Sequence, residues 1–198
     1  MHRAALRQAL EDYRATWASG RPVNGHDLAR ERMAAARFLE FLESTPDCFE
    51  RSHPVGHLTG SALVYCPATR RVLLTLHRKL DKWLQLGGHA DGCPRLDQVA
   101  LQEVGEESGL SEFGFWDYEA DLAVATRPLP FDLDVHLIPG ELPHLHYDVR
   151  YLVRADSAQP LKVSPESKDL GWFSFEQARK LCPEESMQRQ FAKLEALA

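Results

Sequence analysis

Three glutamates that could bind a metal ion, Glu103, Glu106 and Glu107, fall within five residues of the sequence. Their spacing places them on one face of a helix, where like charges repel each other by roughly a few tenths of a kcal/mol per pair. A hard divalent cation such as Mg²⁺ would offset this repulsion, because it prefers oxygen ligands. Clusters of acidic residues are otherwise usually exposed to water. The spacing therefore favours either a magnesium-type site or a solvated acidic face.

The residues around these glutamates predict the helix that presents them. We expect a helix over residues 96–108, with Pro94 just before it and Gly109 as a left-handed residue after its last turn. Upstream, Gly87 and Gly88 allow the chain to bend sharply, so that its backbone can approach the carboxylates. The segment thus combines an acidic helix with a glycine bend that can close one side of a metal site.

The same stretch resembles the signature of the Nudix hydrolases. That signature specifies nine positions: a glycine, a glutamate, an arginine–glutamate pair, an aliphatic residue, two glutamates, a glycine and an aliphatic residue. Seven of the nine are matched at the required spacing, by Gly88, Glu103, Val104, Glu106, Glu107, Gly109 and Leu110. The departures are Pro94, in place of the first glutamate, and Gln102, in place of the arginine. Losing both partners of an ion pair costs less stability than leaving one charge without its partner. Asp91 and Asp97 lie near enough in sequence to substitute for the missing residues.

This resemblance implies a Nudix-type α/β/α sandwich around a mixed β-sheet. It also implies a hydrolase that uses Mg²⁺ or Mn²⁺ to cleave a diphosphate linkage in a nucleoside diphosphate derivative or a related small molecule. The cation would neutralise phosphate oxygens and lower the pKa of the attacking water. By position in the signature, the Gly87 carbonyl, Glu103 and Glu107 would bind the essential ion. Glu106 would bind a second ion or orient the water.

Two candidate residues lie outside the signature. Nudix hydrolases often take a general base from a downstream loop, and our candidate is Glu166, with Asp169 behind it. Arg78 lies at the end of a predicted strand just upstream of the signature. Its guanidinium could hold the substrate's phosphates, although a solvated strand end is an equally good interpretation.

Histidines form a second group of candidates. His89 lies inside the signature, and His144, His146, Asp148 and Arg150 alternate onto one face of a predicted strand. That set could bind substrate or a transition metal, so we take His89, His146, Asp148 and Arg150 as candidate substrate ligands. The alternative is a polar strand face in contact with water. The combination of GGH in the signature with HLHYDVR on the strand is similar to a bacterial branch of the Nudix family.

Hydrophobic periodicity predicts a helical hairpin at the N-terminus, formed by residues 3–18 and 27–44. We expect a helical extension over residues 1–50, followed by a Nudix hydrolase domain over residues 51–198. In that domain short strand-like segments alternate with a few helices, which indicates an α/β fold with a mixed sheet covered by helices. The predicted strands are 57–67, 71–79, 83–88, 116–126, 132–138, 145–154 and 169–174, and two further helices begin near residues 175 and 185.

The composition is that of an ordinary globular protein, with 198 residues, 44% hydrophobic and 26% charged. A net charge of −6 argues against non-specific binding of nucleic acid. The four cysteines form no CxxC pair, so we expect free thiols in a reducing compartment. The sequence shows neither an apolar signal core nor a run of roughly 18 apolar residues. We therefore expect a cytoplasmic protein without a membrane partner, and the N-terminal hairpin leaves a homodimer possible.

Two other functions are open at this point. Pro94 and Gln102 motivate a catalytically weak sensor that keeps the fold and binds a nucleotide ligand. An isopentenyl-diphosphate isomerase-like enzyme would need an active-site cysteine, for which Cys66 and Cys93 are available, together with a glutamate and histidine metal ligands. We favour the hydrolase, because the signature is much closer to the hydrolase pattern.

Overall fold

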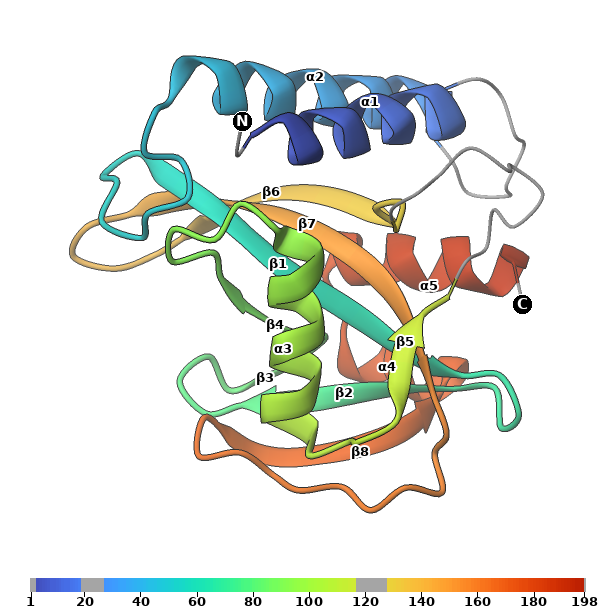
Figure 1. Cartoon of the computed structure of the whole chain (residues 1–198). Helices are drawn as coiled ribbons and strands as arrows, with labels where there is room; N and C mark the ends of the chain where they lie inside the picture. Colours follow the sequence, from blue (N-terminus) through green and yellow to red (C-terminus); the bar gives the residue numbers. More distant parts are fainter. Residues whose placement is uncertain (1–2, 19–26, 117–127, 198) are drawn as a thin grey trace.

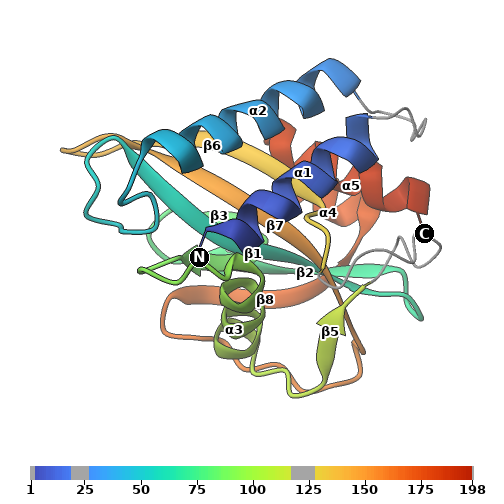
Figure 2. The same cartoon turned by 45° about the horizontal axis from the view of Figure 1, so that its top comes forward.

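The computed structural model of the chain describes residues 3–18, 27–116 and 128–197. Its strands form one mixed β-sheet with helices packed on it, and two helices from the N-terminal part lie together along one side (Figure 1). The second view shows this helix pair crossing over β6 and β7 (Figure 2). The α/β/α sandwich and the N-terminal helical hairpin expected from the sequence are therefore both confirmed.

The element boundaries follow the predicted ranges closely. The helices are α1 (Ala4–Ala18), α2 (Leu28–Ser44), α3 (Leu96–Ser108), α4 (Phe175–Leu181) and α5 (Glu185–Leu197). The strands are β1 (Gly56–Cys66), β2 (Arg71–His77), β3 (Lys82–Leu84), β4 (Leu86–His89), β5 (Phe113–Phe115), β6 (Asp132–Ile138), β7 (His144–Ala155) and β8 (Ser167–Ser174). The single strand predicted at 83–88 is divided into β3 and β4, which pair with β2 and β1 respectively. The short strand β5 was not predicted, and the strand predicted at 116–126 lies outside the described residues except for its first position. Among the described helices, none is both long and apolar enough to cross a bilayer.

Strand β1 organises the sheet because it pairs with three other strands. Along one edge it runs parallel to β7, with His57 opposite His146. Along the other edge it pairs antiparallel with β4, where Thr59 is opposite His89, and further on with β2. Side chains that are directly opposite in a sheet share a face. The register of β1 therefore decides which side chains of β4 and β7 meet.

Helix α3 packs very closely on one face of β1 and β4. A Cβ atom added to Gly60 would lie 2.6 Å from the carbonyl oxygen of Leu96 and 3.2 Å from Cβ of Val99. Only glycine leaves room for this approach. Gly109, at φ 70°, ends the helix in the left-handed conformation expected from the sequence. The helix is thereby fixed in both position and length.

The N-terminal helices add their apolar sides to the core of the sheet. In α1 the predicted stripe is buried, and its members are Leu6, Leu10, Tyr13 and Trp17. In α2, which begins after the capping side chain of Asp27, Phe41 stacks on Tyr147 of β7 with ring centroids 3.8 Å apart. Both helices contribute to the same continuous hydrophobic core as the sheet. A domain boundary near residue 50 stays a prediction.

A buried ion cluster connects α2 and α5 to β6 and β7. Its members are the acids Glu31, Asp132, Asp134 and Asp148 and the bases Arg30, Arg150, Arg189 and Lys193. At its centre, the fully buried Asp132 accepts hydrogen bonds from Lys193 Nζ at 2.7 Å and from Arg189 Nη2 at 2.8 Å. Buried charges of this kind persist only when each has partners of opposite sign.

Replacing Asp132 with asparagine is expected to destabilise the fold by roughly 3–5 kcal/mol, because it leaves buried cations without their counter-charge. Burial opposes the ionisation of Asp132, but Lys193 and Arg189 hold its pKa well below the ordinary value. Stability gained in this way is present above the unfolded pKa, which is about 3.9, and is lost as the pH falls below it. The difference in free energy of unfolding between wild type and Asp132→Asn, measured with urea, should therefore be larger at pH 7 than at pH 3.

Glu176→Gln, which removes an exposed ion pair with Lys180, is the control and should change the free energy of unfolding little. Equal stability of wild type and Asp132→Asn at pH 7 would contradict the account.

Candidate functional site

The acidic face of α3 lies against the glycines of β4. These glycines do not form the sharp bend expected from the sequence, because β4 is a regular strand that pairs with β1 in unbroken register. The backbone N–H of Gly87 donates to Oε2 of Glu107 at 2.9 Å, and only 6% of Glu107 is exposed. A Cβ atom at Gly88 would lie 2.0 Å from Oε1 of Glu103, so a side chain there would displace that carboxylate. Strand β4 thus holds two of the three candidate glutamates in place, through the backbone N–H of Gly87 and the missing side chain of Gly88.

Glu106, the third glutamate, is exposed. Its Oε1 accepts a hydrogen bond from Nε2 of Gln102 at 2.8 Å. Gln102, which stands where the signature has arginine, is therefore engaged with the outer glutamate. The two aspartates near enough in sequence to substitute each have an arginine of their own, since Asp91 pairs with Arg51 and Asp97 with Arg95.

The two inner carboxyl groups are poised to change their ionisation near neutral pH. Burial raises the pKa of Glu103 to about 7, and the negative charges of Glu106 and Glu166 add to the effect. Burial also raises the pKa of Glu107 to about 7, although the hydrogen bond from Gly87 acts in the opposite direction. A divalent cation would relieve this cost by balancing both charges. The carboxylate oxygens and the cradle at Gly88 therefore fit a hard metal ion such as Mg²⁺ or Mn²⁺.

Glu166 lies in the loop before β8, close enough for its charge to raise the pKa of both inner glutamates. Arg78 holds the backbone of this loop. Its Nε donates to the carbonyl of Pro165 at 2.9 Å, its Nη2 donates to the carbonyl of Ser167 at 2.7 Å, and its backbone N–H donates to the carbonyl of Glu166. The geometry favours Arg78 as a residue that positions Glu166. Contact between Arg78 and a phosphate stays a prediction, as does a role for the exposed Asp169.

Asp148 and Arg150 share one face of β7 with His144 and His146, as the alternation predicted. Both are buried in the ion cluster, where Arg150 Nε donates to Oδ2 of Asp148 at 2.7 Å. Asp148 also accepts from the hydroxyls of Thr59 at 2.9 Å and Ser61 at 2.8 Å. A carboxylate with this many partners is well suited to fixing β1 against β7. Direct contact of Asp148 or Arg150 with substrate is not supported by these bonds and stays a prediction.

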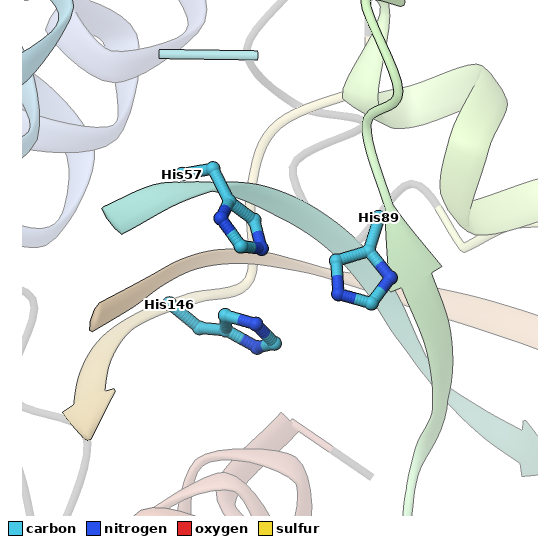
Figure 3. Close-up of side chains that lie close together, drawn as sticks. All are labelled: His57, His89 and His146. Atoms are coloured by element: carbon cyan, nitrogen blue, oxygen red, sulfur yellow. The ribbon is translucent and has the colours of Figure 1, made fainter. Parts of the chain in front are cut away.

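His89 and His146 meet a third histidine, His57, that was absent from the predicted site. The three rings come from β4, β7 and β1 and point toward one another (Figure 3). Burial lowers the pKa of His57 to about 4 and that of His146 to about 3, and it also lowers the pKa of His89. The rings are therefore neutral at pH 7. The available signal for His57 was the alternation of polar residues His57, Thr59 and Ser61 at the start of an otherwise apolar strand.

The two cysteines considered for an isomerase lie in different parts of the fold. Cys66 lies at the opposite end of β1, nine residues from His57, which corresponds to roughly 30 Å of extended strand. Its Sγ accepts a hydrogen bond from the backbone N–H of Ser157. Cys93 is half-buried in the turn after β4. All four cysteines are free thiols, as predicted.

Solved structures with a similar fold include three Nudix proteins. A Caenorhabditis elegans Ap4A hydrolase, in a binary complex, matches with a TM-score of 0.55 at 17% identity over 70% of this chain and 95% of that chain. A NUDIX family hydrolase from Clostridium perfringens matches with a TM-score of 0.52 at 25% identity over 71% and 95% of the two chains. The NUDIX domain of Shewanella oneidensis NrtR, complexed with ADP ribose, matches with a TM-score of 0.53 at 16% identity over 80% and 97%. No protein-family model matches the sequence, and no curated protein matches it either.

Replacing Glu107 with glutamine is expected to raise the melting temperature of the metal-free protein at pH 8. A carboxyl group whose folded pKa is raised makes the folded state less stable as the pH rises from its unfolded pKa, about 4.3, through about 7. Glutamine cannot ionise, and its amide oxygen can still accept the Gly87 N–H. Thermal unfolding in chelator at pH 5 and pH 8 measures the effect, which should be present mainly at pH 8.

Glu106→Gln, at an exposed position, is the control and should change the melting temperature little. A variant that melts below wild type at pH 8 would refute the explanation.

Proposed function

We propose that this chain, which has a Nudix-type fold, is a divalent-metal-dependent pyrophosphohydrolase. Its substrate is a small molecule with a diphosphate linkage, such as a nucleoside diphosphate derivative. The observation that carries the proposal is the pair Glu103 and Glu107, two carboxyl groups held against Gly87 and Gly88 of β4 with pKa values of about 7. The names of two structural neighbours support the substrate class, since Ap4A and ADP ribose both contain linked phosphates.

Each acidic residue then has a distinct task. Glu103, Glu107 and the Gly87 carbonyl hold the cation, while the exposed Glu106 is available to a second ion or to the attacking water. When bound, the cation neutralises the phosphate oxygens and makes water a stronger nucleophile at neutral pH. Because Glu103 and Glu107 are partly protonated near pH 7, binding of the cation releases protons. Activity is therefore expected to rise with pH through this range.

Glu166 accepts a proton from the attacking water at its carboxylate. A general base has to be within hydrogen-bonding reach of that proton, so the position of its loop matters. Arg78 fixes this position through the carbonyls on either side of Glu166, and Ser167 is buried with its hydroxyl 2.6 Å from that of Thr75. The loop is therefore anchored to β2 while the side chain of Glu166 stays exposed.

Glu107→Gln should lower turnover roughly 100-fold or more, because loss of one ligand charge weakens the cation's stabilisation of the transition state. The substrate is first identified with a panel of nucleoside diphosphate derivatives and dinucleoside polyphosphates, in Mg²⁺ or Mn²⁺, by phosphate release after phosphatase treatment. Undiminished turnover by Glu107→Gln would refute the assignment. Binding of a panel member without turnover over hours would instead favour the sensor.

Arg78→Lys should lower kcat roughly 10- to 100-fold with little change in KM, because small displacements of a catalytic group have effects of this size. Lysine keeps the charge but loses the planar fork that reaches two carbonyls at once. Steady-state kinetics on the identified substrate measures the split. Lys79→Gln, which alters the exposed neighbouring cation, is the control. A large rise in KM with unchanged kcat would show that Arg78 binds the substrate's phosphates instead.

A further inference from the structure

Three imidazole rings converge at the N-terminal end of β1. His57, His89 and His146 each offer a ring nitrogen, and these atoms all lie within 4.8 Å of one another. The ring centroids are 4.7 Å apart for His57 and His146, and 5.1 Å apart for each of the other two pairs. The rings thus form an almost equilateral triangle around a common centre (Figure 3).

The nitrogen atoms of this triangle lack the partners that buried polar atoms normally have. His57 is only 2% exposed, yet within the described part of the chain neither of its ring nitrogens has a hydrogen-bond partner. The same holds for the buried Nε2 of His146. Buried polar groups without a partner are uncommon and costly, and they often mark a place where an ion or an ordered water binds. The missing hydrogen-bond partners are therefore a second observation, separate from the short distances between the rings.

We propose that His57, His89 and His146 form a binding site for a transition-metal ion of the Zn²⁺ class, separate from the carboxylate site on α3. Imidazole nitrogen is a preferred ligand of Zn²⁺ and similar ions, whereas Mg²⁺ prefers oxygen. In a tetrahedral site with Zn–N distances of about 2.0–2.1 Å, the centres of three imidazole rings lie roughly 5 Å apart. The observed triangle has this size, so small rotations of the rings complete the site.

Three histidines leave one position of a tetrahedral ion open. This arrangement is that of catalytic zinc sites, since structural sites use four protein ligands. A fourth ring, His144, is stacked on His57 with centroids 5.0 Å apart, and His136 lies beside His146. Nδ1 of His136 is 3.1 Å from Oδ2 of Asp134, which ties the histidine group to the ion cluster. The open position can therefore accept water or a group of a ligand beside further polar side chains.

The two metal sites are neighbours because they share β4. Gly88 makes room for Glu103 on the α3 side of the strand, and the next residue, His89, points to the histidine triangle. Their donor atoms differ, so each site selects a different class of ion. Occupancy of the histidine site can thus be measured without reference to any hydrolytic activity.

Binding of Co²⁺ to the full-length, metal-stripped protein tests the proposal, because Co²⁺ replaces Zn²⁺ and reports its coordination by visible absorption. We expect one Co²⁺ per chain in the presence of excess Mg²⁺, with the strong absorption of a four-coordinate ion and displacement by Zn²⁺. His89→Gln and His146→Gln, at half-buried positions, should each weaken binding roughly 100-fold or more, since each removes one of three ligands.

Two matched variants complete the experiment. His77→Gln alters a histidine outside the triangle and should leave Co²⁺ binding unchanged. Glu107→Gln alters the carboxylate site and should also leave it unchanged, so that failure of the proposed function and failure of this inference can be told apart. Thermal unfolding with and without Zn²⁺ gives a second readout, because an ion that binds only the folded state raises the melting temperature. The proposal is overturned if Co²⁺ is removed by excess Mg²⁺, or if folded His89→Gln and His146→Gln bind it as wild type does.

Discussion

The pairing register of β1 is the constraint on which the rest of the structure depends. Parallel pairing with β7 places His57 beside His146 and Thr59 beside Asp148, while antiparallel pairing with β4 places Thr59 opposite His89. A shift of one residue would turn every one of these side chains to the opposite face. The hydrogen bonds from Thr59 and Ser61 to the buried Asp148 oppose such a shift, because it would leave a charged group without its donors.

The carboxylate site shows a conflict between stability and chemistry. Burial of Glu103 and Glu107 raises both pKa values, which means that the ionised form required for binding a cation is disfavoured in the folded protein. The glycines of β4 add to this cost, since glycine loses more conformational freedom on folding than other residues. The large hydrophobic core supplies stability elsewhere in the fold. Acid groups at a binding site are commonly perturbed in this direction.

Elements with strong local signals could be predicted from the sequence. Helix α3 has the range that the sequence predicts, because Pro94 and Gly109 mark its two ends and the spacing of the glutamates marks its acidic face. The stripe of α1 and the ranges of β6 and α5 were equally clear. The short strand β5 was missed, because three residues carry too little periodicity and are held only by pairing with β7.

Features that depend on distant contacts could not be predicted. His57, His89 and His146 are brought together by the register of three strands, and nothing in the local sequence around His57 indicates its neighbours. Asp148 and Arg150 were predicted to share a face, but their burial in an ion cluster depends on Arg189 and Lys193, about 40 residues away in the sequence. Alternation reveals which side chains share a face of a strand, whereas only the packing of helices shows whether that face is open to a ligand.

Strand β4 has only four residues, and three in succession are committed to different neighbours. Gly87 donates its N–H to Glu107, Gly88 accommodates Glu103, and His89 completes the histidine triangle. An insertion or deletion within this strand would therefore disrupt both sites in a single event. Point substitutions at His57 or His146, by contrast, would remove the histidine triangle alone. Among descendants of this protein, the histidine triangle can therefore be lost while the acidic site persists, but a change in the length of β4 eliminates the two together.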